Sequence, residues 1–219
     1  MTGNDISFEV EFRCHFDNPE EAYKKLPFLR TCLQREVSFV TRFLGLALFK
    51  SGQLLRMSEA VHQGEVRNYL GWKGPDTGTF ANIRQEIDED ITSGFVISEI
   101  MRRLGSNKEM RTPVAVAQEL ELLGYGQFMS FTGKQITGYN EQNDVNVKLM
   151  TCPELRWPLL LELEKTARTE REAVQREIEL RELSDKLHLR SRLVKEEPPS
   201  LLYAKLFGHR NPPDRLSKI

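Results

Sequence analysis

The chain has 219 residues, which is long enough for one domain with a sizeable core or for two small ones. Hydrophobic residues make up 39% and charged residues 29%, a balance typical of a globular protein rather than a disordered one. With 31 basic and 32 acidic side chains, the chain has no net field to attract a polyanion. We therefore expect no duplex nucleic-acid partner, and any phosphate binding must come from locally arranged cations.

The sequence also lacks the usual signals for secretion or for a membrane. No basic region followed by an apolar run opens the chain, and no apolar stretch approaches the length that a bilayer requires. Cys14, Cys32 and Cys152 are scattered without CxxC spacing, which argues against a disulfide framework and a cysteine zinc site. We expect a cytoplasmic protein without membrane contact.

Taken in chain order, the predicted elements are mostly strands. Residues 7–14 alternate, with Phe8, Val10 and Phe12 on one face and Glu9 and Glu11 on the other. Further strands are expected over 53–60, 66–72, 80–87, 128–139, 143–150 and 159–164, and residues 37–48 are expected to form a strand or a strand followed by a turn. Capping and stop signals predict helices over 19–33, 93–104, 112–123, 169–189 and 200–207. About eight strands without regular βα alternation indicate an α+β protein built on a barrel or sandwich.

Charged side chains recur at alternate positions of four of these strands. The sets are Glu9, Glu11 and Arg13; Arg56; Arg84, Glu86 and Asp88; and Glu162 and Glu164, with Lys73 and Lys134 near strand ends. Any one of these faces alone is best explained as the wet side of a half-buried sheet. Together they fit a second arrangement, because neighbouring carboxylates are tolerated best where cations face them or a metal binds between them. The charged faces would then converge inside a closed barrel.

The order of these motifs resembles the CYTH, or triphosphate tunnel metalloenzyme, superfamily. Glu9-Val-Glu11-Phe-Arg13 is similar to its ExExK signature, and the later landmarks follow in the family's order. They are 48–56 (LFKSGQLLR), 70–75 (LGWKGP), 84–88 (RQEID), 130–134 (SFTGK), 161–164 (LELE) and 200–203 (SLLY). The resemblance spans about residues 7–207. It implies a single domain over 1–219, with 208–219 as a loose tail, folded as an eight-stranded antiparallel β-barrel with flanking helices.

What the resemblance implies about function is a polar tunnel that binds a triphosphate-bearing small molecule. Mg²⁺ or Mn²⁺ would be held by Glu9, Glu11, Glu162 and Glu164. Phosphates would be gripped by Arg13, Arg56, Lys73, Arg84 and Lys134, with Glu86 and Asp88 also lining the tunnel. Glu11, Lys73 and Lys134 would serve catalysis, and the expected reaction is hydrolysis of inorganic, nucleoside or thiamine triphosphate. The alternatives are cyclisation of ATP, as in class IV adenylate cyclases, and binding without turnover.

Departures from the family pattern favour phosphate binding over efficient turnover. Arg13 replaces the signature lysine, Ser58 and Gln135 replace expected cations, and Met150 falls near the expected acid of the penultimate strand. The predicted helix 169–189 carries an apolar stripe formed by Ala173, Val174, Ile178, Leu180, Leu183 and Leu187. Such a stripe more often packs within its own domain, and a homodimer seam is the alternative.

Overall fold

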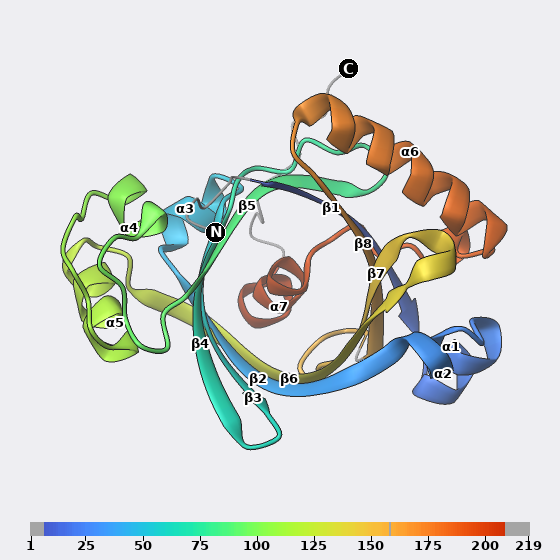
Figure 1. Ribbon diagram of the computed structural model, residues 1–219, viewed down its shortest axis with the longest axis horizontal. Coiled ribbons are helices and arrows are strands. Elements are labelled where there is room, and N and C mark those ends of the chain that lie inside the picture. The colour runs from blue at the N-terminus through green and yellow to red at the C-terminus, as the bar shows by residue number, and fades with distance from the viewer. Residues whose placement is uncertain (1–6, 158, 209–219) are drawn as a thin grey trace.

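The computed structural model describes residues 7–157 and 159–208, in which eight strands close into one antiparallel barrel (Figure 1). The strands are β1 (Ser7–Phe16), β2 (Leu33–Leu44), β3 (Leu54–His62), β4 (Glu65–Lys73), β5 (Asn82–Asp90), β6 (Gln127–Asn140), β7 (Val145–Thr151) and β8 (Leu159–Ala167). They follow the order β1-β5-β4-β3-β2-β6-β7-β8, and β8 pairs with β1 to complete the circle. The predicted eight-stranded barrel is confirmed. Residues 209–219 of the expected loose tail lie outside the described residues.

Seven α-helices accompany the barrel in the described part of the chain. They are α1 (Pro19–Lys25), α2 (Leu29–Cys32), α3 (Leu46–Lys50), α4 (Glu99–Arg103), α5 (Pro113–Leu122), α6 (Glu170–Lys186) and α7 (Pro198–Phe207). The predicted start of α5 is confirmed, because the Thr112 side chain accepts a hydrogen bond from the Ala115 backbone N–H and Pro113 occupies the first turn. Thr169 caps α6 in the same way.

Three predicted elements differ from the structure. The expected helix over 19–33 ends at Lys25, because Leu26 precedes Pro27 and is driven out of the helical region. The segment 37–48, expected as a strand or a strand followed by a turn, is a strand only as far as Leu44, where Gly45 takes a left-handed backbone and a short helix follows. The expected helix over 93–104 is helical only over Glu99–Arg103, and Phe95 instead pairs with Met110 in an isolated β-bridge.

The outer face of the barrel is apolar where helices cover it. Helix α6 lies over β1 and β8, where its Ala173, Leu180 and Leu183 pack in one core with Val10 and Phe12 of β1 (Figure 1). A second outer core joins residues of α4 and α5 to β3, β4 and β5. Strand alternation therefore leaves the opposite, charged faces of β1 and β8 to point inward. No helix of the described residues is both long and apolar enough to cross a membrane.

Helix α7 occupies one end of the barrel interior, where it appears inside the ring of strands (Figure 1). Leu202 and Tyr203 of α7 pack with Phe43 of β2, Phe131 of β6 and Leu160 of β8. Tyr203 is also in ring contact with Phe49 of α3, at 5.1 Å between centroids. The inward side chains at this end are therefore apolar and packed against α7, whereas the charged side chains lie further along the same strands.

Candidate functional site: a charged barrel interior

Strand register brings the charged positions of three neighbouring strands into one row. Arg13 of β1 lies opposite Glu162 of β8, and Glu162 lies opposite Lys148 of β7. Directly opposed residues of antiparallel strands face the same side of the sheet, so these three side chains share the interior. In the next row Glu11 lies opposite Glu164. The sequence-predicted faces of β1 and β8 are thus brought together inside the barrel.

Arg13 is the centre of a buried ion-pair network. Its side chain is 2% exposed, its Nε donates to Glu162 Oε1 at 2.8 Å, and its Nη2 donates to Glu11. Burial opposes the charge of Glu162, but the charges of Lys148 and Arg13 hold its pKa well below the usual range. Burial raises the pKa of Glu11 well above its usual value, and the charge of Glu162 adds to this effect. The barrel interior therefore moves the pKa values of these two neighbouring carboxyl groups in opposite directions.

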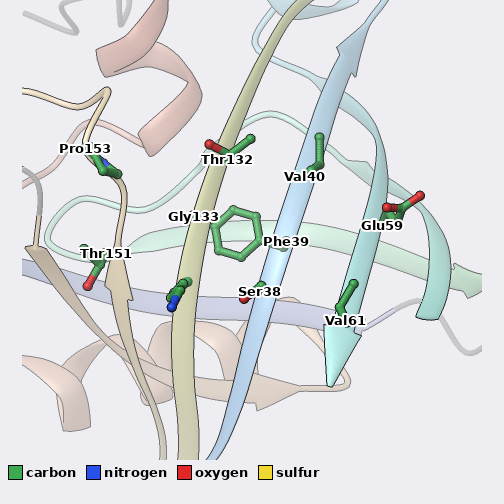
Figure 2. A pocket seen from close by; sticks show the side chains of 10 residues that line it. Ser38, Phe39, Val40, Glu59, Val61, Thr132, Gly133, Thr151 and Pro153 are labelled. Carbon is green, nitrogen blue, oxygen red and sulfur yellow. The ribbon is translucent and has the colours of Figure 1, made fainter. Parts of the chain in front are cut away.

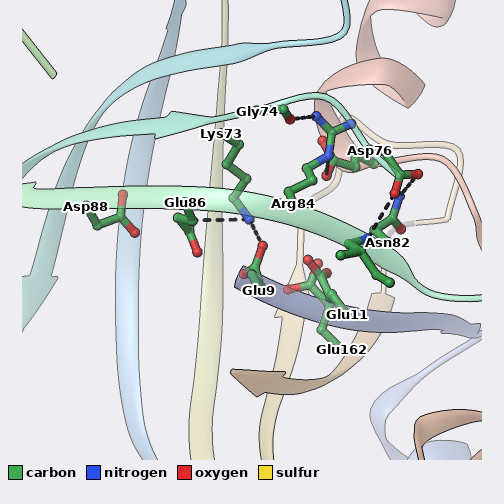
Figure 3. Close-up of polar contacts among 12 residues, drawn as sticks. Glu9, Glu11, Lys73, Gly74, Asp76, Asn82, Arg84, Glu86, Asp88 and Glu162 are labelled. Atoms are coloured by element: carbon green, nitrogen blue, oxygen red, sulfur yellow. Dashed lines mark hydrogen bonds and ion pairs between the residues drawn. The ribbon is translucent and has the colours of Figure 1, made fainter. Parts of the chain in front are cut away.

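A second network lies on β1, β4 and β5 (Figure 3). Lys73 Nζ contacts Glu9 and lies 3.3 Å from Glu86 Oε1. Burial opposes ionisation of Glu9, but Lys73 and Lys148 together lower its pKa to about 2. Burial and the charge of Glu9 raise the pKa of Glu86 to about 8. One lysine is thus shared between two carboxylates that differ widely in acidity.

Arg56 of β3 extends this network by reaching over the neighbouring strand β4 to β5. Its Nη2 donates to Glu86 Oε1 at 3.0 Å and to Asp88 Oδ2 at 3.0 Å, although β4 lies between β3 and β5. The position of β4 opposite both Arg56 and Asp88 is Gly71, and a Cβ there would meet Asp88 and lie 2.7 Å from Arg56 Nε. The missing side chain of Gly71 therefore leaves the space through which the arginine passes.

Arg84 lies between the charged interior and the segment that leads into α7. Its Nη1 donates to the carbonyl oxygen of Gly74 at 2.7 Å (Figure 3). The same Nη1 donates to the carbonyl oxygen of Gly52 at 2.8 Å, and Nε lies 2.9 Å from Glu197 Oε1. Arg13 makes a parallel contact, from Nη1 to the Glu196 carbonyl oxygen at 3.1 Å. Two sequence-predicted phosphate ligands therefore also anchor the chain just before α7. No sequence motif marks Glu197 as a site residue, because its partner Arg84 lies 113 positions away in the chain.

Lys148 is a cation of the interior that the motif comparison did not assign. Its Nζ donates to Glu162 Oε2 at 2.6 Å, and its side chain is 28% exposed. Burial alone would lower its pKa, but the charges of Glu162, Glu11, Glu164 and Glu9 raise it above the ordinary lysine value. The alternation of β7 could have placed Lys148 beside the charged strands, but strand pairing was needed to show its partner.

Lys134 is not brought to this cluster, which corrects its expected place in the tunnel. It pairs with Thr151 and Ser38 on the face of the sheet that points outward, and its side chain is 68% exposed, 4.0 Å from Glu36 Oε1. An open pocket of about 530 Å³ lies over β2, β3 and β6 at this point, and Figure 2 shows its lining side chains, including Phe39 and Glu59. Lys134 therefore belongs to a separate surface.

The four expected metal ligands are Glu9, Glu11, Glu162 and Glu164. Their carboxylate oxygens are the hard donors that Mg²⁺ and Mn²⁺ prefer. Cations of the chain already contact the first three, and Glu164 is the member without such an ion pair among the described residues. Within residues 7–157 and 159–208, no three acidic, histidine or cysteine side chains are grouped so that they could hold a metal ion. The donor chemistry suits a hard cation, but the arrangement does not fit a preformed metal site.

Solved structures share this fold at low sequence identity. PH1819 protein from Pyrococcus horikoshii is 16% identical, with a TM-score of 0.66 over 90% of this chain and 99% of that one. A proposed adenylate cyclase from Vibrio parahaemolyticus is also 16% identical, with a TM-score of 0.64 over 90% and 98% of the two chains. HpAC1 from Hippeastrum, described as a proposed adenylyl cyclase with a dominant triphosphatase activity, is 12% identical, with a TM-score of 0.59 over 91% and 96%. These similarities show the fold.

Neither a family model nor a curated protein matches the sequence. The chain covers nearly the full length of each of these structures, so the shared fold includes the whole barrel rather than a fragment of it.

Proposed function

We propose that the barrel interior binds a triphosphate-bearing small molecule and supports its hydrolysis. The observation that carries this proposal is the gathering of five cations with six carboxylates on the inner faces of the strands. The cations are Arg13, Arg56, Lys73, Arg84 and Lys148, and the carboxylates are Glu9, Glu11, Glu86, Asp88, Glu162 and Glu164. Removing charged groups from water is costly, so a buried cluster of this size supports a site for a charged ligand.

The chemistry of these cations suits phosphate oxygens. Arg13 and Arg56 carry planar guanidinium groups that can donate two hydrogen bonds to one phosphate, and Lys73 and Lys148 supply compact positive charge. In hydrolysis, an oxygen of water forms a bond to the terminal phosphorus while the bond from that phosphorus to the bridging oxygen breaks. The leaving diphosphate keeps the bridging oxygen and its electron pair, and the water gives up one proton. Glu86, whose pKa is about 8, is the interior carboxylate best suited to receive it, because a general base works best when its pKa lies near the operating pH.

Mg²⁺ or Mn²⁺ belongs to this proposal as the ion expected for turnover, entering with the triphosphate rather than occupying a preformed site. Reported names of two proteins with this fold include adenylate cyclase, and one includes triphosphatase activity, which supports testing both outcomes on this chain. ATP hydrolysis would yield ADP and phosphate, whereas cyclisation would yield cyclic AMP and pyrophosphate.

The deciding experiment incubates the full chain with tripolyphosphate, ATP or thiamine triphosphate and with Mg²⁺ or Mn²⁺, and measures phosphate, pyrophosphate and cyclic AMP. We expect phosphate release, with Arg56→Gln strongly reduced and Lys134→Gln unchanged, because only Arg56 lies in the interior cluster. Formation of pyrophosphate and cyclic AMP from ATP would show that the reaction is cyclisation rather than hydrolysis. Thermal stabilisation by tripolyphosphate without any product would show that the chain binds the compound but does not hydrolyse it. No product and no stabilisation would reject the proposal.

A further inference from the structure

Each oxygen of Glu162 is already in contact with a cation of the chain. Arg13 Nε holds Oε1 at 2.8 Å, and Lys148 Nζ holds Oε2 at 2.6 Å. Each oxygen keeps a second lone pair, but a divalent ion bound there would lie close to the guanidinium or ammonium group that donates to the same oxygen. The carboxylate is buried, so the repulsion between the ion and these cations would be weakly screened.

Lys148 lies where a divalent ion would be expected to act. Its charge interacts with Glu162, Glu11, Glu164 and Glu9, which are the four carboxylates assigned to metal binding by sequence. It stands directly opposite Glu162 in the strand register, and its aliphatic stem projects inward from a strand whose other face is buried. One ammonium group therefore reduces the mutual repulsion of the same carboxylates that a metal ion would bind.

Lys73 and Arg13 complete this internal neutralisation from the other side. Lys73 contacts Glu9, and Arg13 contacts Glu11, so each carboxylate of β1 in this cluster has a cation of its own. Lys148 differs from these two because its side chain is 28% exposed, against 7% and 2%. It is the cation of the group that a ligand entering the interior can reach with least rearrangement.

We infer that Lys148 is a built-in substitute for a metal ion, so that the barrel binds a triphosphate without first binding a divalent cation. The phosphate oxygens of the triphosphate would pair directly with the ammonium group of Lys148, while Arg13 continues to hold Glu162. This inference rests on the proposed function for the identity of the ligand. Its statement about metal binding rests on the contact between Lys148 and Glu162 and on the cations that contact Glu9 and Glu11.

The first test measures Mn²⁺ binding to the full chain by electron paramagnetic resonance, without any phosphate compound. Wild type and Lys148→Arg are expected to bind Mn²⁺ weakly, because both keep the charge. Lys148→Met is expected to bind it at least about tenfold more tightly, since the carboxylates lose a competing cation. Lys134→Met is the matched control on the outer face and should behave like wild type. Equal Mn²⁺ affinity of wild type and Lys148→Met would overturn the inference.

The second test measures tripolyphosphate binding by calorimetry, once with EDTA and once with Mn²⁺. We expect wild-type affinities in the two conditions to agree within about threefold, and Lys148→Met to bind at least about tenfold more weakly in EDTA. Binding of tripolyphosphate by wild type only when Mn²⁺ is present would overturn the inference. Failure of tripolyphosphate to bind in both conditions would reject the proposed function, and the Mn²⁺ titration would still decide the role of Lys148. Circular dichroism melts of each variant establish that it is folded.

Discussion

Arg56 Nη2 lies 3.0 Å from Asp88 Oδ2, although a whole strand separates the two residues in the barrel. The contact exists because that strand carries Gly71 at the crossing point. Charges on β3 and β5 are thereby joined into one network with Lys73 and Glu86. A residue without a side chain is thus part of the reason that the interior cations converge.

Gly71→Ala is expected to disturb this network more than the fold. The added methyl group would lie 2.7 Å from Arg56 Nε and against Asp88, so Arg56 must leave its present position. Both neighbours are flexible side chains, and we expect a loss of stability of only about 1 kcal/mol. Tripolyphosphate binding should weaken about as much as in Arg56→Gln. Gly126→Ala is the control, because the nearest neighbours of its methyl group would be atoms of the flexible Glu121 carboxylate. Unchanged binding in Gly71→Ala would contradict the role given to the crossing.

Arg13→Met should strongly destabilise the protein. It leaves Glu11 without its cation and Glu162 with only Lys148, both in a buried setting. Breaking a buried pair by removing one partner costs roughly 3–5 kcal/mol. Urea denaturation followed by circular dichroism measures the change. Arg42→Met, at an exposed position on β2, should alter stability by less than about 0.5 kcal/mol. A similar small change in Arg13→Met would show that the network does not hold the barrel together.

The titration of Glu86 predicts that stability falls as the pH rises. Its pKa is about 8 in the folded protein, against the ordinary 4.5, so the folded state keeps a proton that the unfolded chain releases. The stabilising contribution is therefore complete below pH 4.5 and is lost progressively up to about pH 8, by roughly 2–5 kcal/mol in total. Glu86→Gln removes this titration, so its free energy of unfolding should fall less over the same range. Parallel pH profiles of wild type and Glu86→Gln would show that Glu86 titrates normally.

Glu177 of α6 fastens the loop before β5, and Glu177→Gln should loosen it. Its Oε1 accepts hydrogen bonds from the backbone N–H groups of Thr79, Phe80 and Ala81, at 2.7, 2.5 and 3.0 Å. An amide keeps the shape but accepts these bonds less strongly than a carboxylate, and we expect a loss of about 1–3 kcal/mol. Hydrogen exchange of residues 79–81 should accelerate. Glu182→Gln, exposed on the same helix, should leave both quantities unchanged, and an equal effect there would argue against the clamp.

The apolar stripe of α6 is partly explained by packing within the barrel. Ala173, Leu180 and Leu183 are buried against the outer face, whereas Val174 and Ile178 are 49% and 42% exposed. A homodimer seam through this helix stays a prediction.

Local sequence determined the strands and the side chains that each strand offers. Alternation at Glu9, Glu11 and Arg13 depends only on the period of a strand, and the same rule identified the faces of β5 and β8. The start of α5 at Thr112 and Pro113 followed from backbone hydrogen-bonding needs that are local in the chain. Such features are predictable because the atoms involved lie within a few residues of one another.

Only the tertiary structure decided which charged positions meet. Closure of the barrel pairs β1 with β8, the register between β7 and β8 sets Lys148 against Glu162, and the register of β6 turns Lys134 outward. Glu197 reaches Arg84 only because α7 folds back into the barrel. These relationships depend on strand order and register between distant segments, and a shift of one residue would exchange the inner and outer faces. The sequence therefore carried the charges of the interior, and long-range pairing decided their partners.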